Sequence, residues 1–130
     1  KRFPKRPFYI ISVPGKLKWD QLWAKKLDEQ GRLKEAYEVY CGLLDLPLFE
    51  DEENDIRLAQ VLTLLLLGDT RKAETIFQRI TIMTVRQRCR SLHLQSCFDE
   101  RAGEFEEARQ NLLAAASEYD SNKDVRLATG

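Results

Sequence analysis

The sequence has little of the residues on which enzymes, metal centres and membrane spans depend. Of its 130 residues one is histidine and three are cysteine. It contains no phosphate-binding glycine loop, no ordered serine, histidine and aspartate set, and no paired carboxylates outside ordinary surface patterns. No stretch of 18 apolar residues occurs, so no membrane-spanning helix is encoded. We therefore expect a protein that is not an enzyme, holds no cofactor or metal and takes no small-molecule substrate.

The cysteines, Cys41, Cys89 and Cys97, lack the even count and spacing of a disulfide framework, which indicates a reducing compartment. Cys89, His93 and Cys97 share one helical face, but the ends of this stripe are ~12 Å apart along the axis, too far for one metal ion. We expect a cytoplasmic protein. Because the chain starts at Lys1 rather than at a methionine, we expect a fragment or processed form from which targeting information is lost.

Charge is balanced overall and uneven along the chain. The 21 basic and 21 acidic residues give a net charge of zero, yet the first 18 residues hold six basic residues and no acid. The sequence predicts a basic arm on an acidic body. No acid lies between Ile76 and Phe98, where four arginines cluster. Nucleic-acid-binding modules carry a strong basic surplus, so the balanced total argues against such a partner.

A six-residue pattern of glycine, four residues and alanine occurs three times. It spans Gly31–Ala36, Gly68–Ala73 and Gly103–Ala108, with the glycines 37 and 35 residues apart. A bulky apolar residue follows each alanine by four positions: Tyr40, Phe77 and Leu112. Self-similarity at this period is typical of helical repeat arrays. The sequence therefore predicts three helix-turn-helix units.

Each recurring position of the pattern has a physical role within one unit. Glycine suits the left-handed residue that ends a helix at a tight turn. Alanine lets the two helices approach closely, and the bulky residue fills the space between neighbouring pairs. The expected helices span about 17–30, 32–45, 54–67, 70–83, 85–102 and 105–118. They form pairs over about 17–45, 54–83 and 85–118 within a repeat region of residues 16–120, preceded by an arm at 1–15 and followed by a tail at 121–130.

The arm differs from the repeats in its residues. Pro4, Pro7, Pro14 and Gly15 exclude a helix there. Its apolar residues, among them those of the segment 8–13, lead us to expect that it lies against an apolar surface of this chain or of a neighbour.

Two helix starts also carry capping signals. Asp69 is expected to cap the fourth helix, and Thr84 with Gln87 forms a capping box for the fifth.

The glycine, alanine and aromatic positions resemble the tetratricopeptide repeat family over roughly residues 17–120. Pentatricopeptide repeats share the same six-residue pattern and a period near 35, and stay an alternative. The resemblance implies an all-α fold of antiparallel helix pairs stacked as a right-handed superhelix. It also implies that the first helix of each pair lines a concave groove.

By this resemblance, nine residues are expected to line a partner-binding groove: Lys18, Gln21, Lys25, Leu58, Leu62, Leu65, Arg90, His93 and Cys97. The three leucines exceed what the second pair needs for its own packing. They are interpreted either as an apolar groove floor or as core covered by flanking elements. Lys25, Arg90 and His93 would orient an acidic or carboxylate-bearing partner.

We therefore expect a protein–protein interaction module, a scaffold or chaperone-like adaptor that binds a peptide or partner helix in the groove. Two alternatives stay open. One is an RNA-binding helical repeat. The other is a structural subunit of an oligomer or larger assembly, whose groove is filled by its own arm or by a neighbouring chain.

Overall fold

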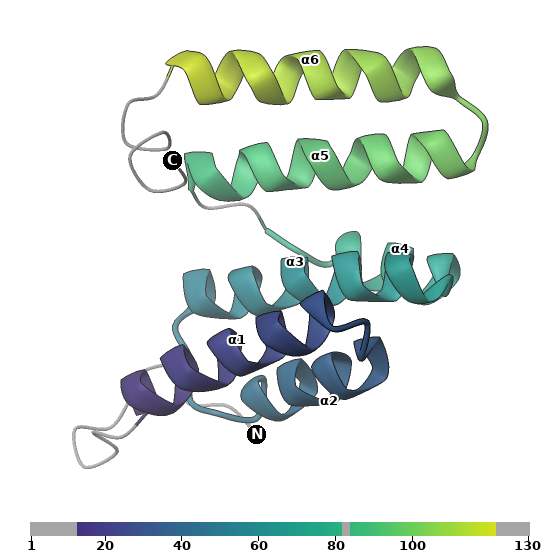
Figure 1. Ribbon diagram of the computed structural model, residues 1–130. Coiled ribbons are helices and arrows are strands. Elements are labelled where there is room, and N and C mark those ends of the chain that lie inside the picture. Colours follow the sequence, from purple (N-terminus) through teal and green to yellow (C-terminus); the bar gives the residue numbers. More distant parts are fainter. Residues whose placement is uncertain (1–12, 82–83, 122–130) are drawn as a thin grey trace. The chain divides into compact units, whose positions relative to one another are not determined.

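The structure is a computed structural model that describes residues 13–81 and 84–121. Every regular element of these two ranges is an α-helix, which confirms the predicted all-α class (Figure 1). The helices of the described residues are α1 (Val13–Glu29), α2 (Leu33–Leu43), α3 (Glu50–Leu67), α4 (Thr70–Phe77), α5 (Val85–Arg101) and α6 (Phe105–Ser121). The arm up to residue 12 and the tail from residue 122 lie outside the described residues.

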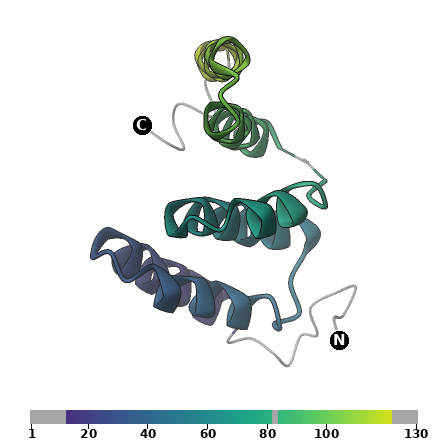
Figure 2. The same cartoon turned by 90° about the vertical axis from the view of Figure 1, so that its right-hand side faces the viewer.

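The chain divides into two compact units, Lys1–Ile80 and Thr81–Gly130. We call them the four-helix unit, which contains α1 to α4, and the two-helix unit, which contains α5 and α6. In the four-helix unit each helix packs against the next along the chain. Figure 2 shows its two hairpins as two layers. In the two-helix unit α5 packs along α6.

All three hairpins turn at the glycine that the repeat predicts. Gly31, Gly68 and Gly103 have φ angles of +78°, +91° and +82°, in the left-handed region that favours glycine. The glycine N–H donates to the carbonyl three residues earlier at 3.0, 3.1 and 3.1 Å. The next N–H donates to the carbonyl five residues earlier at 2.9, 2.9 and 2.8 Å. This pair of hydrogen bonds is the Schellman motif, and here it ends the first helix of every pair.

The alanine of each pattern starts the second helix in the same way three times. The N–H groups of Ala36, Ala73 and Ala108 donate to the carbonyl of the residue after the glycine, at 3.1, 3.1 and 3.0 Å. All three side chains are buried. A small buried residue therefore stands at this position in every hairpin.

The bulky position four residues after the alanine varies between hairpins. Tyr40 is buried and Phe77 is half-buried, whereas Leu112 is exposed. The expectation that this residue fills the space between neighbouring pairs is wrong for Leu112 in this structure. Leu112 lies on α6, and no described element follows α6 along the chain.

One apolar cluster holds the first hairpin and the start of the second together. Leu17, Ala24, Leu27, Ala36, Tyr40, Leu43, Leu48 and Ile56 form it. These residues come from α1, α2, the following loop and α3. Because the cluster spans three helices, the four-helix unit has a core of its own rather than two independent hairpins.

At both predicted helix starts the N-cap side chain accepts a hydrogen bond from the third N–H of the helix. Asp69 Oδ1 accepts a hydrogen bond from the Lys72 N–H at 3.2 Å, which caps α4. Thr84 Oγ1 accepts one from the Gln87 N–H at 3.0 Å, which caps α5.

Three helix bounds differ from the prediction. α1 begins at Val13, so Pro14 and Gly15 are helical although they were expected to exclude a helix. Proline lacks only an N–H that the first turn leaves unbonded, and it is tolerated there.

α3 begins at Glu50 rather than near 54, because the Glu52 carboxylate accepts a hydrogen bond from the Phe49 N–H at 3.0 Å and acids suit a helix N-terminus. α4 ends at Phe77 rather than near 83.

The turn geometry predicts opposite effects for two glycine-to-alanine changes in the four-helix unit. An added Cβ meets no atom within 4 Å at either Gly68 or Gly42, so only the backbone conformation distinguishes them. Gly68→Ala should destabilise the unit by about 1–2 kcal/mol, because it forces alanine into the left-handed region. Gly42→Ala, inside α2, should stabilise it by roughly 0.5–1 kcal/mol. Urea denaturation measures both, and equal shifts of the two midpoints would contradict the assigned turn.

Candidate partner-binding surface

The predicted groove residues fall on the first helix of each hairpin. Lys18, Gln21 and Lys25 lie on α1, Leu58, Leu62 and Leu65 on α3, and Arg90, His93 and Cys97 on α5. The α1 and α3 residues belong to the four-helix unit, and the α5 residues to the two-helix unit. A groove that joins the two sets stays a prediction.

On α1 the predicted lining is polar and accessible. Lys18 and Lys25 are exposed, and Gln21 is half-buried. The Lys18 ammonium lies 5.9 Å from the centre of the Trp19 ring, in cation–π range. Among the described residues neither Lys25 nor its neighbour Lys26 makes an ion pair. These two ammonium groups are therefore available to a negatively charged ligand.

On α3 the structure corrects two of the three predicted lining residues. Leu58 and Leu65 are only 0% and 2% exposed, so they are packing residues and form no accessible groove floor. α3 is apolar on several sides and is buried along most of its length, as expected for a helix surrounded by other elements. Leu62 is 37% exposed and Leu66, one turn later, is 56% exposed. On α3, Leu62 and Leu66 are therefore the exposed leucines, and we call these two residues the apolar strip.

One hydrogen bond joins the two first helices of the four-helix unit. Thr63 Oγ1 of α3 lies 3.3 and 3.4 Å from the two carboxylate oxygens of Asp28 on α1. Burial raises the pKa of Asp28 above its usual value, and hydrogen bonds from Thr63 and Tyr40 lower it by less. The first helices of the first two pairs, α1 and α3, are thus in direct contact.

On α5 the predicted residues share one face at spacings of three and four. Arg90 and Cys97 are half-buried and His93 is exposed. Burial raises the pKa of the Cys97 thiol, and it does the same for Cys89. The thiolate is the form that attacks substrates or binds metals, so neither cysteine is set up for such chemistry. No cluster of three or more metal-ligating side chains occurs in the described ranges.

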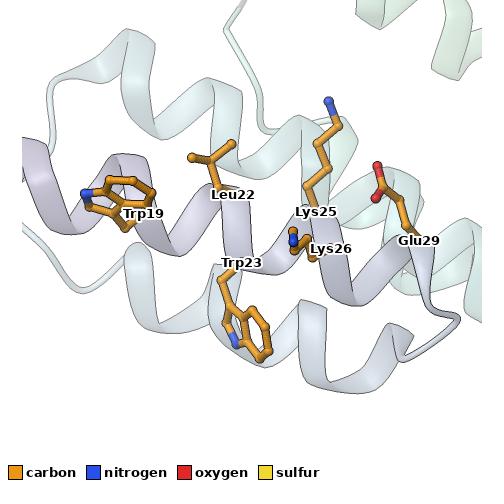
Figure 3. A pocket seen from close by; sticks show the side chains of 6 residues that line it. All are labelled: Trp19, Leu22, Trp23, Lys25, Lys26 and Glu29. Carbon is orange, nitrogen blue, oxygen red and sulfur yellow. The ribbon is translucent and has the colours of Figure 1, made fainter.

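An exposed aromatic face on α1 escaped the sequence prediction. Trp19 and Trp23 are 66% and 49% exposed, and Leu22 lies between them in sequence with a similar exposure. Together with Lys25, Lys26 and Glu29 they line a shallow pocket. Figure 3 shows Leu22 and Lys25 extending to one side of the helix and Trp23 to the other. We call Trp19 and Trp23, which are four residues apart and so share one side of the helix, the α1 aromatic face.

The sequence carries a signal for this face. Leu17, Ala24 and Leu27 are the buried residues of α1, and they recur with helical spacing. The α1 aromatic face is a second apolar stripe on the same helix, offset from the first. A helix with two such stripes has more apolar surface than one neighbouring layer buries.

No helix among the described residues combines the length and apolar character that a bilayer span requires. No protein-family model matches the chain, and neither the curated proteins nor the solved structures contain a significant match to it.

The half-buried carboxyl of Asp28 predicts a pH-dependent effect. Because its pKa is higher in the folded chain than in the unfolded chain, this group favours folding most at low pH. Its contribution falls as pH rises through the folded pKa. Asp28→Asn removes the charge and keeps an oxygen for Thr63. The variant should therefore be more stable than the parent near pH 7, and the difference should vanish below about pH 3.

Urea denaturation of both proteins across this pH range measures the difference. Asp45→Asn, which changes an exposed carboxyl, is the control and should shift stability little at either end. A gain for Asp28→Asn that is the same at both ends of the pH range would contradict the assigned burial.

Proposed function

We propose that this chain is a protein–protein interaction module, a scaffold or chaperone-like adaptor built from tetratricopeptide-like helix pairs. In this proposal the three pairs stack in a right-handed superhelix, and the first helices line a concave groove that holds a peptide or a partner helix. The support for the stack is the turn that recurs three times with the same hydrogen bonds. Repeat arrays of this kind act as extended binding surfaces.

The observation that carries the proposal is the contact between α1 and α3. The Asp28–Thr63 hydrogen bond brings these two first helices together. On them, Leu62 and Leu66 expose apolar surface, and Lys25 is exposed without an ion pair in the described part of the chain. Apolar surface combined with an available ammonium group suits an amphipathic peptide that carries carboxylates.

In the proposed stack, α5 continues the lining with a more polar face. Arg90 and His93 would contribute positive charge or hydrogen-bond donors, and Cys97 would contribute a small, weakly polar side chain. The groove would then have an apolar strip on α3 between cationic side chains on the other two first helices. This charge arrangement favours acidic partners over neutral ones.

The RNA-binding alternative has less support. Its motivation is the acid-free arginine cluster that begins near Arg79 and continues into α5. Arg88 of this cluster is ion-paired with Glu118 of α6 at 3.2 Å, so part of its charge is already compensated. Backbone phosphates require a continuous cationic surface, and the chain as a whole is neutral.

The proposed role requires no chemistry by this chain. Burial raises the pKa of the half-buried Cys89 and Cys97 thiols, and in this proposal the single histidine is a contact residue. The odd number of cysteines suits a reducing compartment such as the cytoplasm, where we place the protein.

Changing Leu62 to aspartate tests the groove. Peptides are first selected from a random display library on the parent protein, and their affinities are measured by fluorescence anisotropy. Leu62→Asp should weaken these peptides at least tenfold, because it places a charge in the apolar strip. Helix content by circular dichroism should not change, since Leu62 already meets solvent. Lys25→Glu should discriminate specifically against the acidic members of the selected set.

Val85→Asp is the matched control, because Val85 is an exposed apolar residue outside the predicted lining. It should leave peptide affinity unchanged. If Leu62→Asp unfolds the protein, Leu62→Gln replaces it in the same assay. Selected peptides that bind all variants equally, or a library that yields no binder, would contradict the groove.

A further inference from the structure

The packing between the first two hairpins gives a template for contacts between repeats. Ile56 of α3 belongs to the apolar cluster that α1 and α2 form. Gln60 Nε2 donates to Cys41 Sγ of α2 at 3.3 Å, and Thr63 reaches Asp28 of α1. These three α3 residues precede their turn glycine, Gly68, by twelve, eight and five positions. They define the face that a first helix presents to the preceding hairpin.

The same positions of α1 face solvent. Twelve, eight and five positions before Gly31 stand Trp19, Trp23 and Lys26. All three are exposed, whereas their α3 equivalents are buried. α1 therefore carries two tryptophans on the face with which α3 packs against a preceding hairpin. The α1 aromatic face thus matches one side of the contact between hairpins, but no hairpin precedes α1 among the described residues to pack against it.

A surface that matches the opposite side of this contact is present on α6. In the template, α2 contributes Tyr40 and Cys41, nine and ten positions after their turn glycine. At the same distances after Gly103, α6 carries Leu112 and Leu113, which are 48% and 55% exposed. α6 thus exposes two leucines on the face with which α2 covers α3. We call these two residues the α6 leucine face.

The charges of the two helices are complementary. α1 holds four lysines, two aspartates and one glutamate, which gives it a net charge of +1. α6 holds three glutamates, one aspartate and one arginine, which gives it a net charge of −3. Lys25 and Lys26 beside the α1 aromatic face make no ion pair within the described residues. An acidic helix is therefore the partner that this face favours.

We propose that two copies of this chain bind head to tail, with the α1 aromatic face of one copy on the α6 leucine face of the next. The contact repeats the α2–α3 packing between molecules: Trp19 and Trp23 take the places of Ile56 and Gln60, and Leu112 and Leu113 those of Tyr40 and Cys41. Because the two faces differ, each copy still has one free face after pairing. Such a contact builds chains or closed rings rather than a simple two-fold dimer.

Two variants that each lose one face test this proposal. The first is Trp19→Glu with Trp23→Glu, and the second is Leu112→Glu with Leu113→Glu. All four side chains are exposed, so both variants should keep the parent helix content. Sedimentation velocity should show the parent growing beyond one chain as its concentration rises, and each variant alone remaining a single chain. An equimolar mixture of the two variants should form a two-chain species and nothing larger, because one intact face of each kind remains.

Tryptophan fluorescence gives a second readout. The chain has two tryptophans, and both belong to the α1 aromatic face. In the mixture the emission comes only from the variant with the altered leucines. It should shift to shorter wavelength on mixing, since the indole rings leave water. Leu66→Glu, an exposed leucine of α3 on neither face, is the control and should associate like the parent.

Three outcomes would overturn the proposal. The first is a parent protein that stays a single chain with exposed tryptophans at all concentrations, which would mean that no second copy occupies these faces. The second is self-association of the leucine-altered variant alone, which would mean that two α1 faces pair with each other. The third is a mixture that stays monomeric although the parent associates. If one variant fails to fold, Trp23→Ser or Leu113→Ser replaces it in the same mixing experiment.

Discussion

The left-handed glycine between paired helices is the constraint on which the other features of this fold depend. At Gly31, Gly68 and Gly103 the backbone reverses within two residues, and its N–H groups bond back to the last carbonyls of the first helix. The next carbonyl then accepts from the alanine N–H and starts the second helix. Because these bonds fix where both helices begin and end, they also fix which side chains meet at the crossing. A small buried alanine follows as a consequence.

The helical class, the three turns and the order of the helices could be predicted from this pattern, because turn chemistry is local. Glycine and alanine at fixed spacing locate the turns, and Asp69 and Thr84 locate two helix starts. The bounds that were wrong depend on weaker or longer-range effects. Proline in a first turn costs no hydrogen bond, so Pro14 did not stop α1. The early end of α4 has no comparable signal in the sequence.

The candidate surface was harder to predict, because burial depends on which elements surround a helix. The leucine stripe of α3 could be read as groove or as core. The structure places Leu58 and Leu65 in the core and leaves Leu62 open. The two tryptophans of α1 are large aromatic residues of the kind that packs in cores, yet both are exposed. A pattern shows that a side chain is apolar, but it cannot show whether a neighbouring layer is there to cover it. That Trp19 and Trp23 are exposed at positions whose α3 equivalents are buried became clear only when the hairpins of the structure were compared.

Amide hydrogen exchange measured by NMR tests the repeated turn most directly. The N–H of the residue after each glycine lies outside the second helix, yet it donates a hydrogen bond to a carbonyl of the first helix. By contrast, the N–H of the second residue of each following helix has no backbone acceptor. The protected amides should be Arg32, Asp69 and Glu104, and the fast-exchanging ones Lys34, Arg71 and Glu106. If the same turn ends each first helix, all three hairpins should show slow exchange at the first set and fast exchange at the second. Fast exchange at any residue of the first set, with its flanking helices protected, would contradict it.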